Sequence, residues 1–128
     1  MNHVPAIALL ILVLACGRPA NRLEYGIEPP SDSRIVVHDR LAVRHGEVHT
    51  RREGLIQHVQ VELVNDGASD EAVEYRWEWM DAEGFQLGDT ISSWQPVVVA
   101  GKAHVLLTGA GPGPAAVNFR LYLRRPAR

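Results

Sequence analysis

Histidines are the side chains of this sequence whose spacing comes nearest to a metal site. His45, His49 and His58 lie within a stretch of 14 residues around a predicted hairpin. Imidazole is a good ligand for zinc and copper, and the i, i+4 spacing of the first two places them on one face of a helix. The segment has no helical pattern, so we place the three on a loop and the adjoining strand. We expect solvated surface histidines, with a zinc or copper site formed by the three as the alternative.

Carboxylates are the second group that could do chemistry. Glu74 and Glu78 fall on one face of a predicted strand, with Arg76 between them. Paired carboxylates perform acid–base catalysis when they share a cleft and one has a raised pKa, but an intervening arginine favours a charge-paired surface. The segment 109–114 is a poor phosphate cradle because its two prolines have no N–H to donate. We therefore expect no catalytic residue, no cofactor and no enzymatic activity.

The only cysteine, Cys16, stands where an N-terminal apolar run stops. Residues 4–15 are apolar and uncharged over 12 positions, too few for a spanning helix of about 20 residues and suited to a signal-peptide core. The sequence VLAC at 13–16 resembles the lipobox of bacterial lipoproteins, in which the thiol takes a diacylglycerol group and the chain is cut before the cysteine. Residue 17 is glycine, not aspartate, and the resemblance therefore implies the periplasmic side of the outer membrane. The alternative is an unmodified cysteine in a buried N-terminal element.

The composition is that of one globular domain. The chain has 128 residues, a net charge of −2 and 13 basic residues, of which 12 are arginine. Charge of this kind gives no overall attraction to nucleic acid, which we exclude as a partner. Residues 17–33 contain prolines and glycines without any period and predict a tether. We expect a lipoprotein signal peptide over 1–15, a lipidated cysteine and flexible tether over 16–33, and a folded domain over 34–128.

After residue 33 the dominant period is two, which predicts strands. The strand candidates are residues 34–43, 55–64, 73–80, 94–99, 104–108 and 117–124. Glycine, proline, asparagine and aspartate separate them, as in turns. This pattern predicts an all-β fold, a single antiparallel β-sandwich of immunoglobulin-like type, with an open barrel as the alternative. A lone cysteine excludes an intersheet disulfide, so we expect Tyr75, Trp77 and Trp79 to fill the space between the sheets.

Three motifs now resemble a known family. They are EYRWEWMDAEG at 74–84, Trp94 with Pro96 two residues later, and FRLYLR at 119–124. Together they resemble the YcfL-like family of small bacterial lipoproteins, and the resemblance covers nearly the whole chain. It implies a lipobox, a tether and one β-rich domain facing the periplasm. The family has no assigned activity, so the resemblance brings no catalytic residues.

Trp94 begins a short strand after a polar stretch. We expect it to cap the core, with an exposed contact anchor as the alternative.

The prediction for the whole chain is an outer-membrane lipoprotein whose sandwich is a binding or scaffolding module of the cell envelope. Its partner is an unidentified envelope protein, and the candidate contacts are Trp94, Glu74, Arg76 and Glu78. A periplasmic metal-binding protein that uses the three histidines is the alternative.

Overall fold

The computed structural model describes residues 32–88 and 93–128. The predicted signal peptide, Cys16 and nearly all of the tether lie outside these residues. The described residues form seven strands: β1 (Ile35–Val37), β2 (Val43–Glu53), β3 (Ile56–Asn65), β4 (Glu71–Met80), β5 (Gln95–Val99), β6 (His104–Ala110) and β7 (Asn118–Arg124). In this part of the chain no helix is long and apolar enough to cross a membrane.

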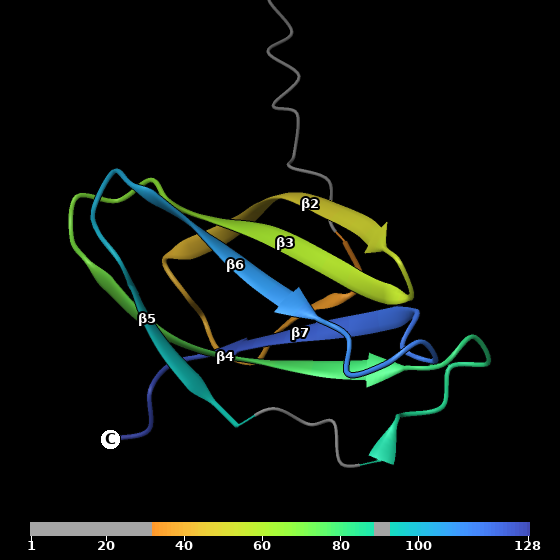
Figure 1. Ribbon diagram of the computed structural model, residues 1–128. Coiled ribbons are helices and arrows are strands. Elements are labelled where there is room, and N and C mark those ends of the chain that lie inside the picture. The colour runs from red at the N-terminus through yellow and green to blue at the C-terminus, as the bar shows by residue number, and fades with distance from the viewer. Residues whose placement is uncertain (1–31, 89–92) are drawn as a thin grey trace, which may run out of the picture.

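The strands form two sheets packed face to face. The four-stranded sheet has the order β1-β7-β4-β5 and the three-stranded sheet has the order β2-β3-β6. Figure 1 shows β2, β3 and β6 in one layer above β4, β5 and β7. All neighbours are antiparallel except β1 and β7, which are parallel. The predicted β-sandwich is thus confirmed. Its division into four and three strands is that of constant immunoglobulin domains, although the strand order differs.

Five strand candidates are confirmed to within two residues at each end, and one is wrong. Residues 34–43 are not one strand, because β1 stops at Val37 and β2 begins at Val43 in the other sheet. β2 itself occupies much of the region that the sequence placed in a loop. Its pairing with β3 shifts register between His45 and Val48. An extra residue at a bulge reverses which face the following side chains occupy, so β2 has no continuous alternation to detect.

An aromatic cluster fills the space between the sheets. Trp77 and Trp79 of β4 are 5% and 4% exposed, and Phe119 of β7 is 1% exposed. The Trp77 and Phe119 rings meet edge to face with centroids 5.7 Å apart, a favourable aromatic geometry. Tyr75 lies at the margin, partly buried against this core, with its hydroxyl donating to Gln95 Oε1 at 2.9 Å. Both tryptophans occupy the predicted position.

Gly109 of β6 gives Trp77 the room that it occupies. A Cβ at this position would lie 2.7 Å from Cε2 and 2.9 Å from Cδ2 of the indole. The neighbouring atoms belong to a rigid ring in a packed core, which cannot swing aside. A glycine within the strand is therefore required by the tryptophan on the facing sheet.

Asn65 joins the two sheets by hydrogen bonds. It ends β3 and is 1% exposed. Its amide nitrogen donates to the carbonyl oxygens of Ser69 at 2.8 Å and of Val99, in β5, at 2.9 Å. Its Oδ1 accepts from the N–H of Gly67 at 3.0 Å. One buried side chain thereby fixes the turn between β3 and β4 and holds it against the opposite sheet.

Gly109→Ala should destabilise the fold by about 1–3 kcal/mol, because the added methyl group overpacks the core against Trp77. Urea unfolding measures the change. Gly113→Ala is the matched control: a Cβ there meets nothing within 4 Å, so it should change the free energy of unfolding by less than about 0.5 kcal/mol. Equal stability of the two variants would contradict this packing.

Asn65→Ala should cost about 3 kcal/mol, because it removes three hydrogen bonds and leaves the buried Val99 carbonyl without its donor. Thermal and urea unfolding again provide the measurement. Asn118→Ala serves as the control, since that exposed side chain makes a single long bond of 3.4 Å to the Asp81 carbonyl. A loss at Asn65 no larger than the loss at Asn118 would show that the intersheet link contributes little.

Candidate binding surface

The outer face of the four-stranded sheet collects the charged residues of β4 and β7. Burying Trp77 and Trp79 turns the alternate residues Glu74, Arg76 and Glu78 outward. The register pairs these three with Arg124, Tyr122 and Arg120, respectively. Residues paired directly across antiparallel strands point to the same side, so six polar or aromatic side chains form three cross-strand pairs on this face.

Trp94 lies on this outer face between two arginines. The guanidinium carbon of Arg124 is 3.9 Å from the indole centroid, and that of Arg76 is 4.8 Å from it. Arg76 also lies 5.0 Å from the centroid of the Tyr122 ring. On the far side of that ring, His38 stacks nearly parallel at 5.5 Å and 8°. The result is a stack of alternating cationic, aromatic and imidazole groups, in an arrangement that favours cation–π attraction.

This position corrects the expectation that Trp94 caps the core. The residue is half-buried and is absent from the set of side chains that make up or pack against the core. The alternation of β5 accounts for this position: Val97 and Val99 face the core and Val98 is exposed, and Trp94, two residues before Pro96 and four before Val98, falls on the same outer side as Val98. The structure brings Trp94 together with Glu74, Arg76 and Glu78, and we call these four with Tyr122 and Arg124 the outer-face cluster.

Both carboxylates of the cluster already have partners. Glu74 Oε2 accepts from Arg124 Nε at 2.8 Å, and Glu78 Oε2 accepts from the Tyr122 hydroxyl at 2.6 Å. The glutamates thus belong to separate pairs, with Arg76 between them, as expected for a charge-paired surface. Arg76 itself forms no ion pair among the described residues, and its Nε is buried without an acceptor there. The guanidinium instead lies over the rings of Trp94 and Tyr122.

The hydrogen bond to Glu78 alters the titration of Tyr122. The adjacent carboxylate raises the pKa of the phenol above its ordinary value of 10.0, burial raises it further, and Arg120 opposes both effects. A negative charge next to the hydroxyl disfavours phenolate. The hydroxyl therefore stays a donor to Glu78 at any physiological pH, and this bond links β7 to β4 on the outer face.

The sequence did not single out Tyr122, Arg124 or His38. The alternation of 117–124 does turn Tyr122 and Arg124 outward, and that signal was available. The register between β4 and β7 was not, and the register decides that Arg76 meets Tyr122 and that Glu74 meets Arg124. His38 follows β1 and reaches this face only because β1 pairs with β7.

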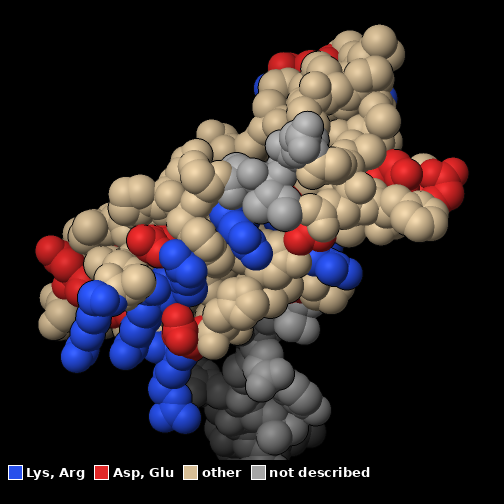
Figure 2. Space-filling model, turned by 90° about the horizontal axis from the view of Figure 1, so that it is seen from below, with Lys and Arg blue, Asp and Glu red and all other residues tan. Residues whose placement is uncertain are grey.

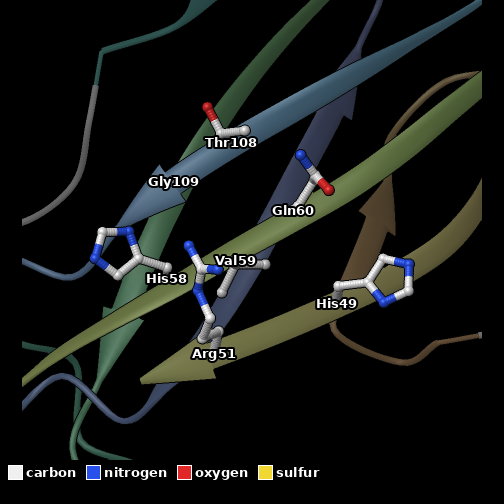
Figure 3. Close-up of a pocket in the computed structure, with 7 residues that line it drawn as sticks. All are labelled: His49, Arg51, His58, Val59, Gln60, Thr108 and Gly109. Atoms are coloured by element: carbon white, nitrogen blue, oxygen red, sulfur yellow. The ribbon is translucent and has the colours of Figure 1, made fainter. Parts of the chain in front are cut away.

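A second polar surface lies on the three-stranded sheet. A shallow hollow of about 350 Å³ is lined by His49, Arg51, His58, Val59, Gln60, Thr108 and Gly109. Figure 3 shows His49 and His58 at opposite ends of this hollow, pointing away from each other. Each imidazole stands beside its own carboxylate: His49 is 2.9 Å from Glu47 and His58 is 3.3 Å from Glu53.

The structure does not bring the three predicted histidines together. His45 precedes the bulge and pairs with the buried Leu63, whereas His49 follows the bulge and pairs with Gln60 on the outer side of the sheet. The Nε2 of His45 accepts instead from the backbone N–H of Asp32 at 3.4 Å. Among residues 32–88 and 93–128, no group of three histidine, cysteine or acidic side chains could hold a metal ion. The alternative of a site formed by His45, His49 and His58 is therefore wrong, because the bulge separates them.

Fold and surface together define a small β-sandwich domain with a stacked arginine–aromatic outer face. A family model matches residues 35–125, and the chain belongs to this family, described as Protein of unknown function (DUF1425). The fold resembles a solved DUF1425 family member from Shewanella sp. pv-4, with a TM-score of 0.61 and 24% identity over 67% of this chain and 80% of that one.

It also resembles Campylobacter jejuni Cj0090, with a TM-score of 0.64 and 20% identity over 74% of this chain and all of that one. Identities this low relate the folds alone. A search of curated proteins finds no match.

Glu78→Gln should lower the pKa of Tyr122 toward 10, because it removes the negative charge that disfavours phenolate. The resonance of the labelled tyrosine ζ-carbon, followed by NMR against pH, reports this value. Because the folded-state pKa is raised, the wild-type bond contributes stability that is complete below pH 10 and is lost as the pH rises through the folded-state value. Glu83→Gln, in an exposed turn, should leave the titration unchanged. A Tyr122 titration that is the same in both variants would contradict the assigned cause.

Proposed function

We propose that this protein is a periplasm-facing outer-membrane lipoprotein whose sandwich is a non-enzymatic binding module, and that the outer-face cluster contacts an envelope protein. The observation that carries the proposal is the place of Trp94. A large aromatic ring stands on the solvent side of a sheet, between two arginines, while the core beside it is complete without it.

The residue types of the cluster support a role in protein recognition. Tryptophan, tyrosine and arginine are the side chains most enriched at energetic centres of protein interfaces. Here Arg76, Tyr122 and Arg124 stand on the adjacent strands β4 and β7, Trp94 directly precedes β5, and the side chains contact one another by stacking. A surface that is ordered before binding loses less conformational entropy when the partner arrives. The same three residue types scattered over a surface would not have this advantage.

The N-terminal sequence supports the membrane anchor. The lipobox resemblance at 13–16 supplies a lipidated Cys16, and residues 17–33 supply a tether. At about 3.5 Å per extended residue the tether would hold the domain up to tens of Å from the bilayer. Acyl chains contribute about 0.8 kcal/mol per buried methylene, so two or three of them hold firmly. The resemblance to the YcfL-like lipoproteins is consistent with this arrangement.

Site-specific photo-crosslinking in intact cells tests the proposal. A photoreactive amino acid at Val98, exposed on the outer face of the four-stranded sheet, should form a discrete adduct with one envelope protein. The matched control is Leu106, on the three-stranded sheet. The two positions are 60% and 55% exposed. A difference in crosslinking between them therefore reflects the sheet face on which each residue lies.

Two further variants complete the test. Trp94→Ala should reduce the Val98 adduct at least about tenfold, as expected for an interface centre. Cys16→Ser should release the protein from the membrane fraction and abolish the adduct. Absence of an adduct at Val98, or the same adduct at Leu106, would overturn the contact surface. Retention of the Cys16→Ser protein in the membrane fraction would overturn the lipid anchor.

A further inference from the structure

We infer that the outer-face cluster, together with the neighbouring Arg120 of β7, binds an acidic segment of its partner protein, with Arg76 and Arg120 as the groups that receive its carboxylates. This inference rests on the proposed contact surface and adds the chemistry of what binds there. It depends on which charges of the face are already compensated and which are not.

The charges of the outer-face cluster and the neighbouring Arg120 do not cancel. The outward residues of β4 and β7 include three arginines and two glutamates. Glu74 forms an ion pair with Arg124 at 2.8 Å, and Glu78 accepts a hydrogen bond from the neutral hydroxyl of Tyr122 at 2.6 Å. Arg76 and Arg120 therefore have no carboxylate ion-pair partner among the described residues. The face retains positive charge although the whole chain has a net charge of −2.

Arg76 is the most constrained of these groups. Its guanidinium lies between the rings of Trp94 and Tyr122, 4.8 Å and 5.0 Å from their centroids. None of its nitrogens donates to an acceptor among the described residues, and its Nε is buried. A guanidinium presents its donors in its plane and stacks through its faces. With an aromatic ring on each side of the guanidinium, its terminal N–H groups are the donors that Arg76 has left to offer to a carboxylate.

Arg120 extends this site along β7. It is exposed, it stands opposite Glu78, and its contact with the Tyr122 hydroxyl acts on that phenol against the effect of Glu78. Figure 2 views the molecule from the side of this sheet and shows arginine and lysine side chains gathered over part of it, with acidic ones between them. An extended acidic segment could thus pair with more than one guanidinium along the strand.

A peptide fits these observations better than an anionic lipid surface does. A membrane-binding face presents protruding basic side chains beside exposed apolar ones. Here Arg76 is half-buried under an indole ring, and two glutamates stand in the same rows. Those glutamates would be repelled by a continuous anionic surface, whereas a segment with spaced carboxylates can pass between them.

The test uses the full-length protein, purified in a mild detergent, and a fluorescein-labelled hexaglutamate peptide as the probe. Fluorescence anisotropy should show saturable binding that weakens as salt is raised and the charges are screened. A hexalysine peptide should not bind. Arg76→Gln should weaken hexaglutamate binding about tenfold, because a constrained donor to a carboxylate is lost, and the exposed Arg120→Gln about threefold.

Arg51→Gln is the matched control, with the same change of charge at an exposed strand position of the other sheet; it should bind like the wild type. Arg120→Gln keeps the test valid if Arg76→Gln disturbs folding, since Arg120 does not take part in the stack around Trp94. Failure to bind hexaglutamate, or equal weakening by Arg51→Gln, would overturn the inference. So would Arg120-dependent binding to phosphatidylglycerol vesicles without hexaglutamate binding, which would indicate a lipid surface.

The two proposals fail in different ways. If the Val98 adduct forms and depends on Trp94 while hexaglutamate does not bind, the contact surface holds and its partner is not acidic. If hexaglutamate binds with the expected dependence on Arg120 but no Val98 adduct forms, the site is an acidic-peptide site and the proposed envelope contact fails.

Discussion

The seating of Trp77 between the sheets is the constraint on which the rest of this domain depends. Its ring packs edge to face on Phe119 and directly over the backbone of Gly109, so β4 can take only one orientation. A shift of one residue along the strand would bring Arg76 and Glu78 into the core and expose both tryptophans. The same contact that fixes the hydrophobic interior therefore also fixes which side chains form the outer face. In a domain without an intersheet disulfide, the indole performs this orienting role.

The sequence was sufficient to predict a strand where one alternating pattern runs through the whole strand. Residues 73–80 and 117–124 alternate without interruption, and β4 and β7 lie within two residues of those positions. It was insufficient where tertiary pairing overrides a local pattern. The bulge between His45 and Val48 breaks the alternation of β2. The sequence pattern therefore did not predict this strand, and it suggested that three histidines lie close together. The pairing register, and with it the arginines that Trp94 contacts, depends on contacts between distant segments, and a local sequence pattern does not encode such contacts.

The two outer faces of the sandwich show why residue type alone does not define a site. The three-stranded sheet displays histidines, an arginine and a glutamine around its hollow, yet each imidazole has its own neighbouring carboxylate. On the four-stranded sheet the groups form one connected arrangement, in which His38, Tyr122, Arg76, Trp94 and Arg124 follow one another in contact. Connected groups restrain one another, whereas isolated pairs remain ordinary surface.

The stacking also explains why an arginine, and not a lysine, suits the centre of this face. A lysine at position 76 would present a compact, strongly hydrated charge, and inserting it between two rings would remove water that the ammonium holds tightly. A guanidinium is more weakly hydrated and planar, so it occupies the slot between Trp94 and Tyr122 while its donors stay in the plane. Much of the rotamer entropy that an exposed arginine would lose on binding is lost when the domain folds. The stability of the aromatic core therefore supports, through the fixed orientation of β4, a charged group that is held ready for a partner.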